Sequence, residues 1–381
     1  MARRAPTLGA MSPLPSTPVD LLVVGAGVVG LAHAVEAHLR GLTVAVVDRD
    51  AFAAGASIRN FGHICVTAQD GDALRYALAA RERWLWLAAK AGFDVVEAGT
   101  VVVARRPEEM AVLEEFAAAR GVEQVRMLDA DAVARQARVA GALGGAHLPL
   151  DLRLDSPTVV PAVAGWLAGQ GVPIAWRTSV LSVKPGLVRT SRGDVRAART
   201  VLAVGHDLDR LLPDVADAAG MTRCLLRMLE VAPPGGVRVA PGVLTGLSLL
   251  RYGGFAAQPS AAALREAVAA EAPELLDAGV NLMFTQRPGG AIVLGDTHHY
   301  SPTHAPFDDE ETAGLLLREG ARLLGAPSLR VLRRWRGQYA SAPAGVLDVE
   351  VAHGVRAVSV TSGIGMTIAH GLAPAVLDSL F

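Results

Sequence analysis

Short hydrophobic runs alternate with amphipathic stretches along the chain, and the run nearest the N-terminus leads into a glycine-rich turn. Residues 20–24 form an apolar run typical of a buried strand, residues 31–39 have a helical pattern, and residues 43–47 form a second apolar run. Two buried strands joined by a helix are typical of a βαβ unit, in which the strands are parallel. The pattern therefore predicts a parallel sheet that begins near residue 20.

Two kinds of segment follow along the chain: strands that end in glycine, and a mixture of helices and antiparallel strands. Strands predicted over 198–204 and 358–361 end in glycine, at Gly205 and at Gly363, and an apolar helix is predicted over 368–380. Elsewhere the pattern predicts helices over 108–120, 130–137 and 159–170, a β-rich stretch over 95–104, and antiparallel strands within 227–251, 281–300 and 330–340. We therefore expect an α/β protein in which a second, mainly antiparallel sheet is inserted.

The turn after the first strand has the spacing of a dinucleotide-binding fingerprint. In Gly25-Ala26-Gly27-Val28-Val29-Gly30 the first glycine permits a tight turn, the second lets a pyrophosphate approach the backbone, and the third allows close helix–strand packing. Asp48 ends the second strand eighteen residues after Gly30, near the offset of about 20 residues for an acid that binds ribose. An acid here disfavours the 2′-phosphate of NADP, whereas NAD and FAD both stay possible.

Composition excludes several classes of protein. Of 381 residues 51% are hydrophobic and 19% are charged, which is typical of a folded chain. The formal net charge of −1 gives no overall electrostatic attraction to nucleic acid or to an anionic membrane. Because 34 of the 36 basic residues are arginine, arginine number alone is not a functional signal. No apolar run is as long as a membrane span.

The cysteines and the N-terminus give two further expectations. Cys65 and Cys224 lack the spacing of a disulfide framework or a zinc site, so we expect no metal and a reducing cytoplasm. The first twenty residues lack the apolar core of a signal peptide. Residues 1–10 are expected to be an extension, with Met11 an alternative start.

Four segments, in this order, resemble the D-amino-acid oxidase and glycine/sarcosine oxidase superfamily of FAD-dependent oxidoreductases. They are the fingerprint with its acid, the Gly55-Ala56-Ser57 loop, the Val204-Gly205 strand end and the loop from Gly363 to Thr367. The resemblance implies noncovalent FAD and a Rossmann-like FAD-binding domain with an inserted α+β substrate domain. The implied FAD-binding domain comprises 11–85, 145–210 and 340–381, and the substrate domain comprises 86–144 and 211–339.

Shorter motifs are similar to one branch of this superfamily. Ile58-Arg59-Asn60-Phe61-Gly62 followed by Gln69, and Trp335-x-Gly337-x-Tyr339, resemble proteins proposed to oxidise aminophosphonates. This implies hydride transfer to flavin from the carbon next to nitrogen in a small anionic amine, followed by imine hydrolysis. The alternatives are glycine, sarcosine or another amino acid as substrate, an NAD-linked dehydrogenase, and a non-catalytic flavoprotein.

The resemblance also implies a set of cofactor-binding residues. The C-terminal loop would cover the flavin ring, where backbone N–H groups at a helix start stabilise negative charge. The residues implied to bind FAD are Gly25, Ala26, Gly27, Val28, Val29, Gly30, Asp48, Arg49, Ala56, Ser57, Arg59, Asn60, Val180, Gly205, Gly363, Ile364, Gly365, Met366 and Thr367.

Two departures from the superfamily affect the substrate site. Tyr339 stands where members acting on amino acids carry an arginine that binds the carboxylate, and residues 292–294 are apolar where some members carry a lysine that assists oxygen. The electron acceptor is therefore O2 or another molecule. The residues predicted to bind substrate are Arg251 and Tyr252, which follow a strand predicted over 247–250, and Arg336; those predicted to be catalytic are His63, His298, His299 and Tyr339.

Overall fold

One continuous sheet runs through the molecule, and one half of it is parallel. The computed structural model describes residues 13–381. The parallel strands lie in the order β18-β11-β1-β2-β8. They are β1 (Val19–Val24), β2 (Val44–Val47), β8 (Ile174–Ala175), β11 (Gly193–Leu202) and β18 (Val355–Ser362). The βαβ unit formed by β1, helix α1 (Val28–Leu39) and β2 confirms the pattern at the start of the chain. Residues 1–10 and Met11 lie outside the described residues.

The other half of the sheet is mainly antiparallel. Its order is β5-β6-β4-β13-β14-β15-β12, and only β13 and β4 are parallel to each other. These strands are β4 (Thr100–Ala104), β5 (Arg126–Asp129), β6 (Gly144–Leu148), β12 (Thr222–Val231), β13 (Gly242–Thr245), β14 (Met283–Gln286) and β15 (Ile292–Gly295), with β16 (His299–Ser301) also beside β12. The mixed α/β architecture inferred from the sequence is confirmed.

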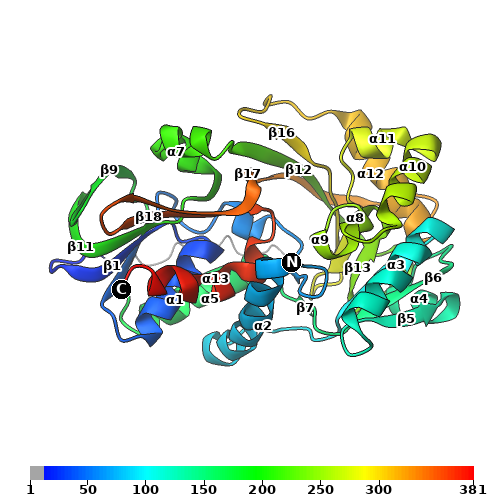
Figure 1. Ribbon diagram of the computed structural model, residues 1–381, viewed down its shortest axis with the longest axis horizontal. Helices are drawn as coiled ribbons and strands as arrows, with labels where there is room; N and C mark the ends of the chain where they lie inside the picture. The colour runs from blue at the N-terminus through cyan, green and yellow to red at the C-terminus, as the bar shows by residue number, and fades with distance from the viewer. Residues whose placement is uncertain (1–12) are drawn as a thin grey trace.

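A single long strand joins the two halves. Strand β17 (Val331–Ala352) pairs antiparallel with β12 along 331–341 and with β18 along 341–352. Figure 1 shows β12 and β17 crossing the middle of the molecule between the two halves. The predicted boundary between 211–339 and 340–381 lies inside β17, so the chain passes between the halves without leaving a strand. The domain boundaries stay a prediction.

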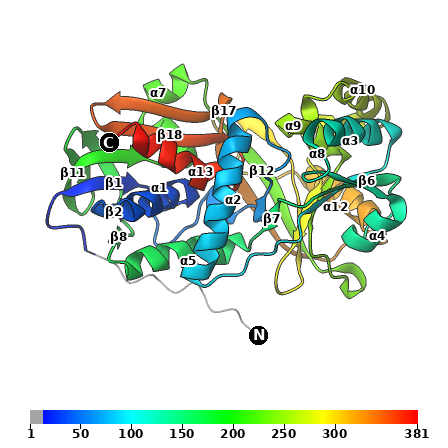
Figure 2. The same ribbon diagram turned by 60° about the horizontal axis from the view of Figure 1, so that its bottom comes forward.

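Four long helices of the described chain pack in the parallel half: α1, α2 (Gly71–Ala91), α5 (Ser156–Gly169) and α13 (Gly365–Asp378). Figure 2 shows α1, α5 and α13 against the sheet, with α2 beside them. The Asp70 carboxylate accepts the N–H of Gly71 at the start of α2, and Gly92 adopts a left-handed conformation at its end. Gly371 lets α13 approach α2 so closely that a Cβ would overlap the Tyr76 backbone. The apolar faces of these helices and of the sheet form the largest core cluster.

Within the described residues, the antiparallel half carries seven helices of four to fourteen residues. These are α3 (Pro107–Arg120), α4 (Ala130–Ala137), α8 (Gly246–Leu249), α9 (Gly253–Ala256), α10 (Ala261–Glu271), α11 (Pro273–Asp277) and α12 (Glu310–Leu323). The strand predicted over 247–250 is wrong, because these residues form α8 and its C-terminal end. A four-residue apolar run has no periodicity that separates a buried strand from a buried helix, and here Leu249 packs inward while the Ser248 hydroxyl bonds to Asn281.

The remaining elements are short. They are the hairpin β9 (Val180–Lys184) and β10 (Leu187–Thr190), the pair β3 (His63–Ile64) and β7 (Leu152–Arg153), helices α6 (Leu208–Leu211) and α7 (Pro213–Ala218), and the 3₁₀ turns η1 (Ala56–Ile58), η2 (Gly205–Asp207) and η3 (Pro234–Gly236). Within 13–381, no helix combines the length and apolarity needed to cross a bilayer.

Candidate active site

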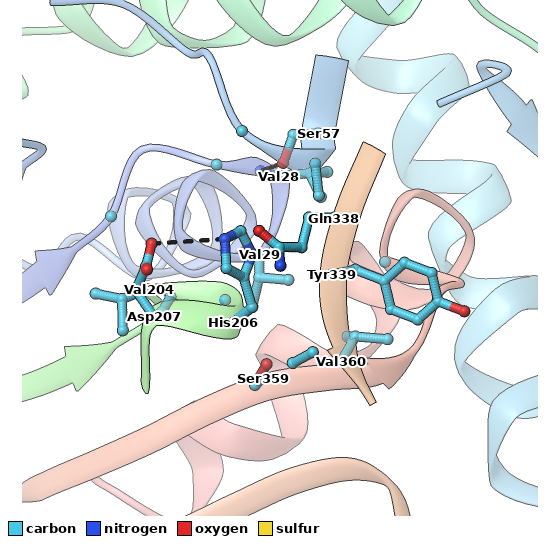
Figure 3. A pocket seen from close by; sticks show the side chains of 18 of the residues that line it. Val28, Val29, Ser57, Val204, His206, Asp207, Gln338, Tyr339, Ser359 and Val360 are labelled. Carbon is cyan, nitrogen blue, oxygen red and sulfur yellow. Dashed lines mark hydrogen bonds and ion pairs between the residues drawn. The ribbon is translucent and has the colours of Figure 1, made fainter. Parts of the chain in front are cut away.

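A cavity of about 510 Å³ lies at the carboxyl ends of β1, β2 and β11 and extends along β17 and β18. Open α/β sheets bind ligands at this edge of the strands. Figure 3 shows Val28 and Ser57 on one side of the cavity and Val204, Tyr339 and Val360 on others. All the residues predicted to bind the cofactor line this cavity except Ala26 and Gly30, which lie in the turn beneath it. The individual contacts stay predictions.

Close backbone packing explains the glycine turn. Gly25 has φ +105°, and a Cβ there would overlap the carbonyl oxygen of Ala203; a Cβ at Gly30 would overlap the carbonyl oxygen of Gly25. The Ser57 hydroxyl accepts the backbone N–H of Val28 at 2.9 Å. The loop that follows Gly55 is thereby docked on the N-terminus of α1, where N–H groups and the helix dipole favour a phosphate.

Asp48 is held by backbone donors on both carboxylate oxygens. Oδ2 accepts the N–H of Ala26 at 2.7 Å, and Oδ1 accepts the N–H of Asp50 at 2.8 Å. Burial raises the pKa of Asp48, and these two hydrogen bonds oppose the rise. Each carboxylate oxygen has a further lone pair. Asp48 can therefore fix the turn and also accept a ribose hydroxyl.

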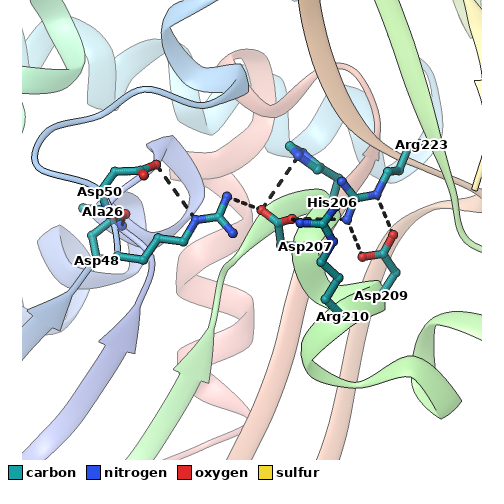
Figure 4. Close-up of polar contacts among 9 residues, drawn as sticks. Ala26, Asp48, Asp50, His206, Asp207, Asp209, Arg210 and Arg223 are labelled. Carbon is teal, nitrogen blue, oxygen red and sulfur yellow. Dashed lines mark hydrogen bonds and ion pairs between the residues drawn. The ribbon is translucent and has the colours of Figure 1, made fainter. Parts of the chain in front are cut away.

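A chain of charged side chains lies beside Asp48, as Figure 4 shows. Arg49 Nη2 lies 2.6 Å from Asp207 Oδ2, and Arg223 Nη2 lies 3.2 Å from the other Asp207 oxygen while it also binds Asp209. Burial opposes ionisation of Asp207, but His206, Arg49 and Arg223 outweigh it and lower the pKa. The network ties the loop after β2 to the segment after β11 and to β12. Sequence reasoning missed Asp207, whose only signal is its place two residues after Gly205.

The Asn60 side chain fixes the conformation of its own loop by hydrogen bonds. Its Nδ2 donates to the carbonyl oxygens of Ala56 and Ser57 at 3.0 Å, and its Oδ1 accepts the N–H of Gly62 at 2.8 Å. The neighbouring Arg59 carbonyl accepts the indole N–H of Trp335 at 3.1 Å. The loop therefore keeps a fixed shape along the cavity wall.

His63 lies in a buried polar cluster at the other end of the cavity. Its Nε2 is 2.6 Å from the Thr100 hydroxyl and 3.3 Å from Asp151 Oδ2. Asp151 Oδ1 accepts the N–H groups of Val66 and Thr67. In the described chain His63 Nδ1 has no hydrogen-bond partner, and the side chain lines the cavity. His63 is thus placed to contact a bound cofactor or substrate.

The C-terminal loop closes the cavity between Tyr339 and α13. Gly363 has φ +77°, and a Cβ there would lie 2.9 Å from the Tyr339 ring, so the close contact requires glycine. The indole N–H of Trp84 donates to the carbonyl oxygen of Met366 at 2.8 Å, and the Thr367 hydroxyl accepts the N–H of Cys65. The first turn of α13 is held in place, with its residues lining the cavity.

A second cavity of about 630 Å³ adjoins the first, and both are lined by Tyr252, Tyr339 and Ile364. Arg251 lines the second cavity, and its guanidinium donates to the hydroxyl oxygens of Tyr339 at 2.7 Å and Tyr300 at 3.2 Å. No carboxylate in residues 13–381 forms an ion pair with Arg251. Burial opposes its charge, but Tyr339, Tyr300 and Asp296 outweigh burial and raise the pKa, so the guanidinium stays protonated.

Three of the predicted substrate and catalytic residues line neither cavity. His298 is buried with Nδ1 3.0 Å from the carbonyl oxygen of Gly279, and burial together with the Arg251 charge lowers its pKa well below the usual value. His299 lies in β16. Arg336 binds Asp308 at 2.8 Å and the carbonyl of Ala305, so it holds a loop. Their predicted roles stay predictions, without a place in the cavity walls.

Asp296 is a buried acid that sequence reasoning did not select. Its Oδ1 lies 3.7 Å from His298 Nδ1 and makes no hydrogen bond in the described part of the chain. Burial raises the pKa of Asp296 to about 7, although the Arg251 charge opposes the rise. An aspartate between two predicted strands has no sequence pattern that marks it as buried.

Comparisons with known proteins agree with this geometry. The family described as FAD dependent oxidoreductase matches residues 20–378. The chain is 26% identical over 223 residues to gamma-glutamylputrescine oxidoreductase of Escherichia coli K12, covering 52% of this chain and about half, 51%, of that curated relative.

Solved structures share the fold over nearly the whole chain. Glycine oxidase from Geobacillus kaustophilus superposes with a TM-score of 0.76 at 19% identity, covering 96% of this chain and 95% of that one. L-alpha-glycerophosphate oxidase from Mycoplasma pneumoniae, with FAD bound, superposes with a TM-score of 0.75 at 18% identity, covering 96% and 95%.

Proposed function

The chain belongs to the family of FAD-dependent oxidoreductases, and on that premise we propose that it oxidises a small amine carrying an anionic group, an aminophosphonate or its N-methyl derivative. Bound FAD supplies a two-electron oxidant that accepts a hydride from the carbon next to nitrogen. Water then hydrolyses the resulting imine to a carbonyl product and an amine or ammonia.

The residues of the first cavity fit FAD. The close contacts at Gly25 and Gly30 shape a turn at which α1 would receive the pyrophosphate, with Ser57 beside it. Asp48 and Arg49 would hold the adenosine end. The start of α13 would face the ring, where its dipole favours negative charge.

The observation that carries the proposal is the arrangement of Arg251, Tyr300 and Tyr339 where the two cavities meet. Both hydroxyl oxygens accept hydrogen bonds from the guanidinium, so both O–H groups are left to donate to a ligand. A protonated arginine without a carboxylate partner and two hydroxyl donors form a receptor for an anion. Three donor side chains suit the three oxygens of a phosphonate, whereas a carboxylate offers two.

An amino acid such as glycine or sarcosine is the second candidate substrate. The same receptor can hold a carboxylate with two of its three donors, and glycine oxidase is one of the proteins that share the fold. The two candidates therefore differ in how many of the donors the anion engages.

Anaerobic reduction of the FAD-loaded protein tests the proposal. We expect 2-aminoethylphosphonate or its N-methyl derivative to bleach the flavin at lower concentration than glycine or sarcosine. Arg251→Ala should raise the concentration needed by about ten- to a hundredfold, the value of a hydrogen bond to a charged group. Arg318→Ala, which alters an exposed helical arginine outside both cavities, is the matched control. Preferential reduction by the amino acids, or by none of these amines, would refute the aminophosphonate proposal.

A further inference from the structure

The lining of the second cavity carries charge of one sign. Its charged side chains are Arg251 and Arg265, and no aspartate or glutamate of the described chain contributes to its wall. The other lining groups are apolar, small or neutral polar, among them Ser341, Thr361 and Ser362. A cavity with two cations and no anion favours a ligand with more than one negative charge.

The two arginines come from different elements of the cavity lining, since Arg251 follows α8 and Arg265 lies on α10. Arg251 binds Tyr339, which also lines the first cavity, so it lies at the boundary with the cofactor site. Arg265 is exposed; like Leu275 and Leu276 of α11, it lines the second cavity but not the first. Within residues 13–381 Arg265 forms no ion pair. Arg251 and Arg265 therefore offer two separate cations to one ligand.

The cavity has room and hydrogen-bonding capacity for a longer molecule. Its volume of about 630 Å³ falls within the range of about 300–1,000 Å³ in which proteins hold drug-sized ligands, well beyond the needs of a two-carbon amine. Thr361 lines it, and its buried hydroxyl has no hydrogen-bond partner in the described chain. A buried hydroxyl without a partner is costly unless a ligand or water satisfies it.

We propose that the substrate carries a second anionic group, which Arg265 binds at the end of the second cavity remote from the cofactor. The inference rests on the proposed oxidation of an anionic amine and extends the substrate class to amines with an anionic group at each end, such as a secondary amine between two carboxylates or between a carboxylate and a phosphonate. Arg251 holds the anionic group nearer the reacting carbon. Arg265 binds the second anionic group and so favours substrates that are long enough and carry a second negative charge.

Binding of unreactive anions to the FAD-loaded protein tests this inference separately from oxidation. In titration calorimetry we expect glutarate to bind about fivefold more tightly than butyrate, since an exposed ion pair contributes up to about that factor. Arg265→Ala should abolish this difference and Arg265→Glu should reverse it, whereas Arg318→Ala should preserve it. Equal affinities for the two anions, or a difference that survives Arg265→Ala, would overturn the inference.

Turnover separates the two proposals. If the second group is recognised, Arg265→Ala lowers kcat/KM about fivefold for iminodiacetate and leaves kcat/KM for glycine unchanged. Oxidation of anionic amines with no effect of Arg265→Ala on either substrate would contradict the role of Arg265 and leave the proposed function intact. Failure of every amine to reduce the flavin, with the anion-binding difference present, would contradict the proposed function alone.

Discussion

The indole N–H of Trp84 in α2 donates a 2.8 Å hydrogen bond to the carbonyl oxygen of Met366, 282 residues later in the chain. Trp84 is only 1% exposed, and its ring packs edge-on against His370 at a centroid distance of 4.5 Å. The contact fixes the first turn of α13, which lines the cofactor cavity. A helix outside the sheet thereby positions a loop that would cover the flavin.

Trp84→Phe should therefore weaken both the fold and cofactor binding. Phenylalanine fills much of the site but lacks the indole donor; because the Met366 carbonyl keeps its partner within α13, the free energy of unfolding should fall by about 0.5–1.5 kcal/mol. We expect a lower urea midpoint and a larger dissociation constant for FAD. Trp86→Phe is the control, because Trp86 is half-buried and makes no hydrogen bond in the described chain. Equal losses in the two variants would contradict a specific role for Trp84.

Asp48→Asn should reduce FAD affinity without removing FAD binding. The amide retains one acceptor oxygen for either Ala26 or Asp50, but its other atom is a donor that faces a backbone N–H. Loss of a charge-assisted hydrogen bond predicts a dissociation constant about ten- to a hundredfold higher, measured by flavin fluorescence. Asp50→Asn, at the next acid along the loop, should change the affinity much less. An unchanged constant in Asp48→Asn would show that the carboxylate charge is not required.

Tyr339→Phe should distinguish the contribution of the Tyr339 hydroxyl from that of its ring. The ring contact with Gly363 is retained, while the acceptor for Arg251 and the donor to an anion are lost. We expect KM for anionic amines to rise about tenfold and kcat to change little, because the hydroxyl would bind the anionic group and take no part in the bond changes at the reacting carbon. Tyr76→Phe, outside both cavities, is the control. A fall in kcat with KM unchanged would instead indicate that the hydroxyl acts in the chemical step.

Asp296→Asn should change how stability depends on pH. Burial raises the pKa of Asp296 from 3.8 to about 7, so the folded protein binds this proton more tightly than the unfolded chain does. Its contribution to the free energy of unfolding is therefore lost as pH rises from about 4 to 7 and stays lost above that.

Relative to wild type, Asp296→Asn should be more stable at pH 8 than at pH 5, by on the order of a few kcal/mol in the difference between the two conditions. Urea unfolding of both proteins at pH 5 and pH 8 measures this change in relative stability. Asp94→Asn alters an exposed acid without an ion pair in the described chain and should show no such trend. A stability difference from wild type that does not vary with pH would contradict a raised pKa at Asp296.

The local order of residues determined the cofactor half of the protein. The turn from Gly25 to Gly30, the acid at the end of β2 and the glycine loop before α13 are each encoded within a few consecutive residues, since tight turns, close backbone contacts and helix starts depend on local conformation. The parallel βαβ unit follows from these signals and the FAD family from their resemblance to the superfamily; both are confirmed, as is the mixed α/β fold.

Only the tertiary structure decided which residues line the cavity beside the cofactor site. Arg251, Tyr300 and Tyr339 meet because β17, β16 and the end of α8 converge, whereas His298 binds Gly279, Arg336 binds Asp308, and neither side chain lines either of the two cavities. In a strand or a short helix, a shift of one residue moves a side chain to another face, and an arginine-rich chain does not mark which guanidinium is buried without a carboxylate. Sequence alone thus determined what the cofactor cavity would hold, and long-range packing decided the shape and charge of the cavity beside it.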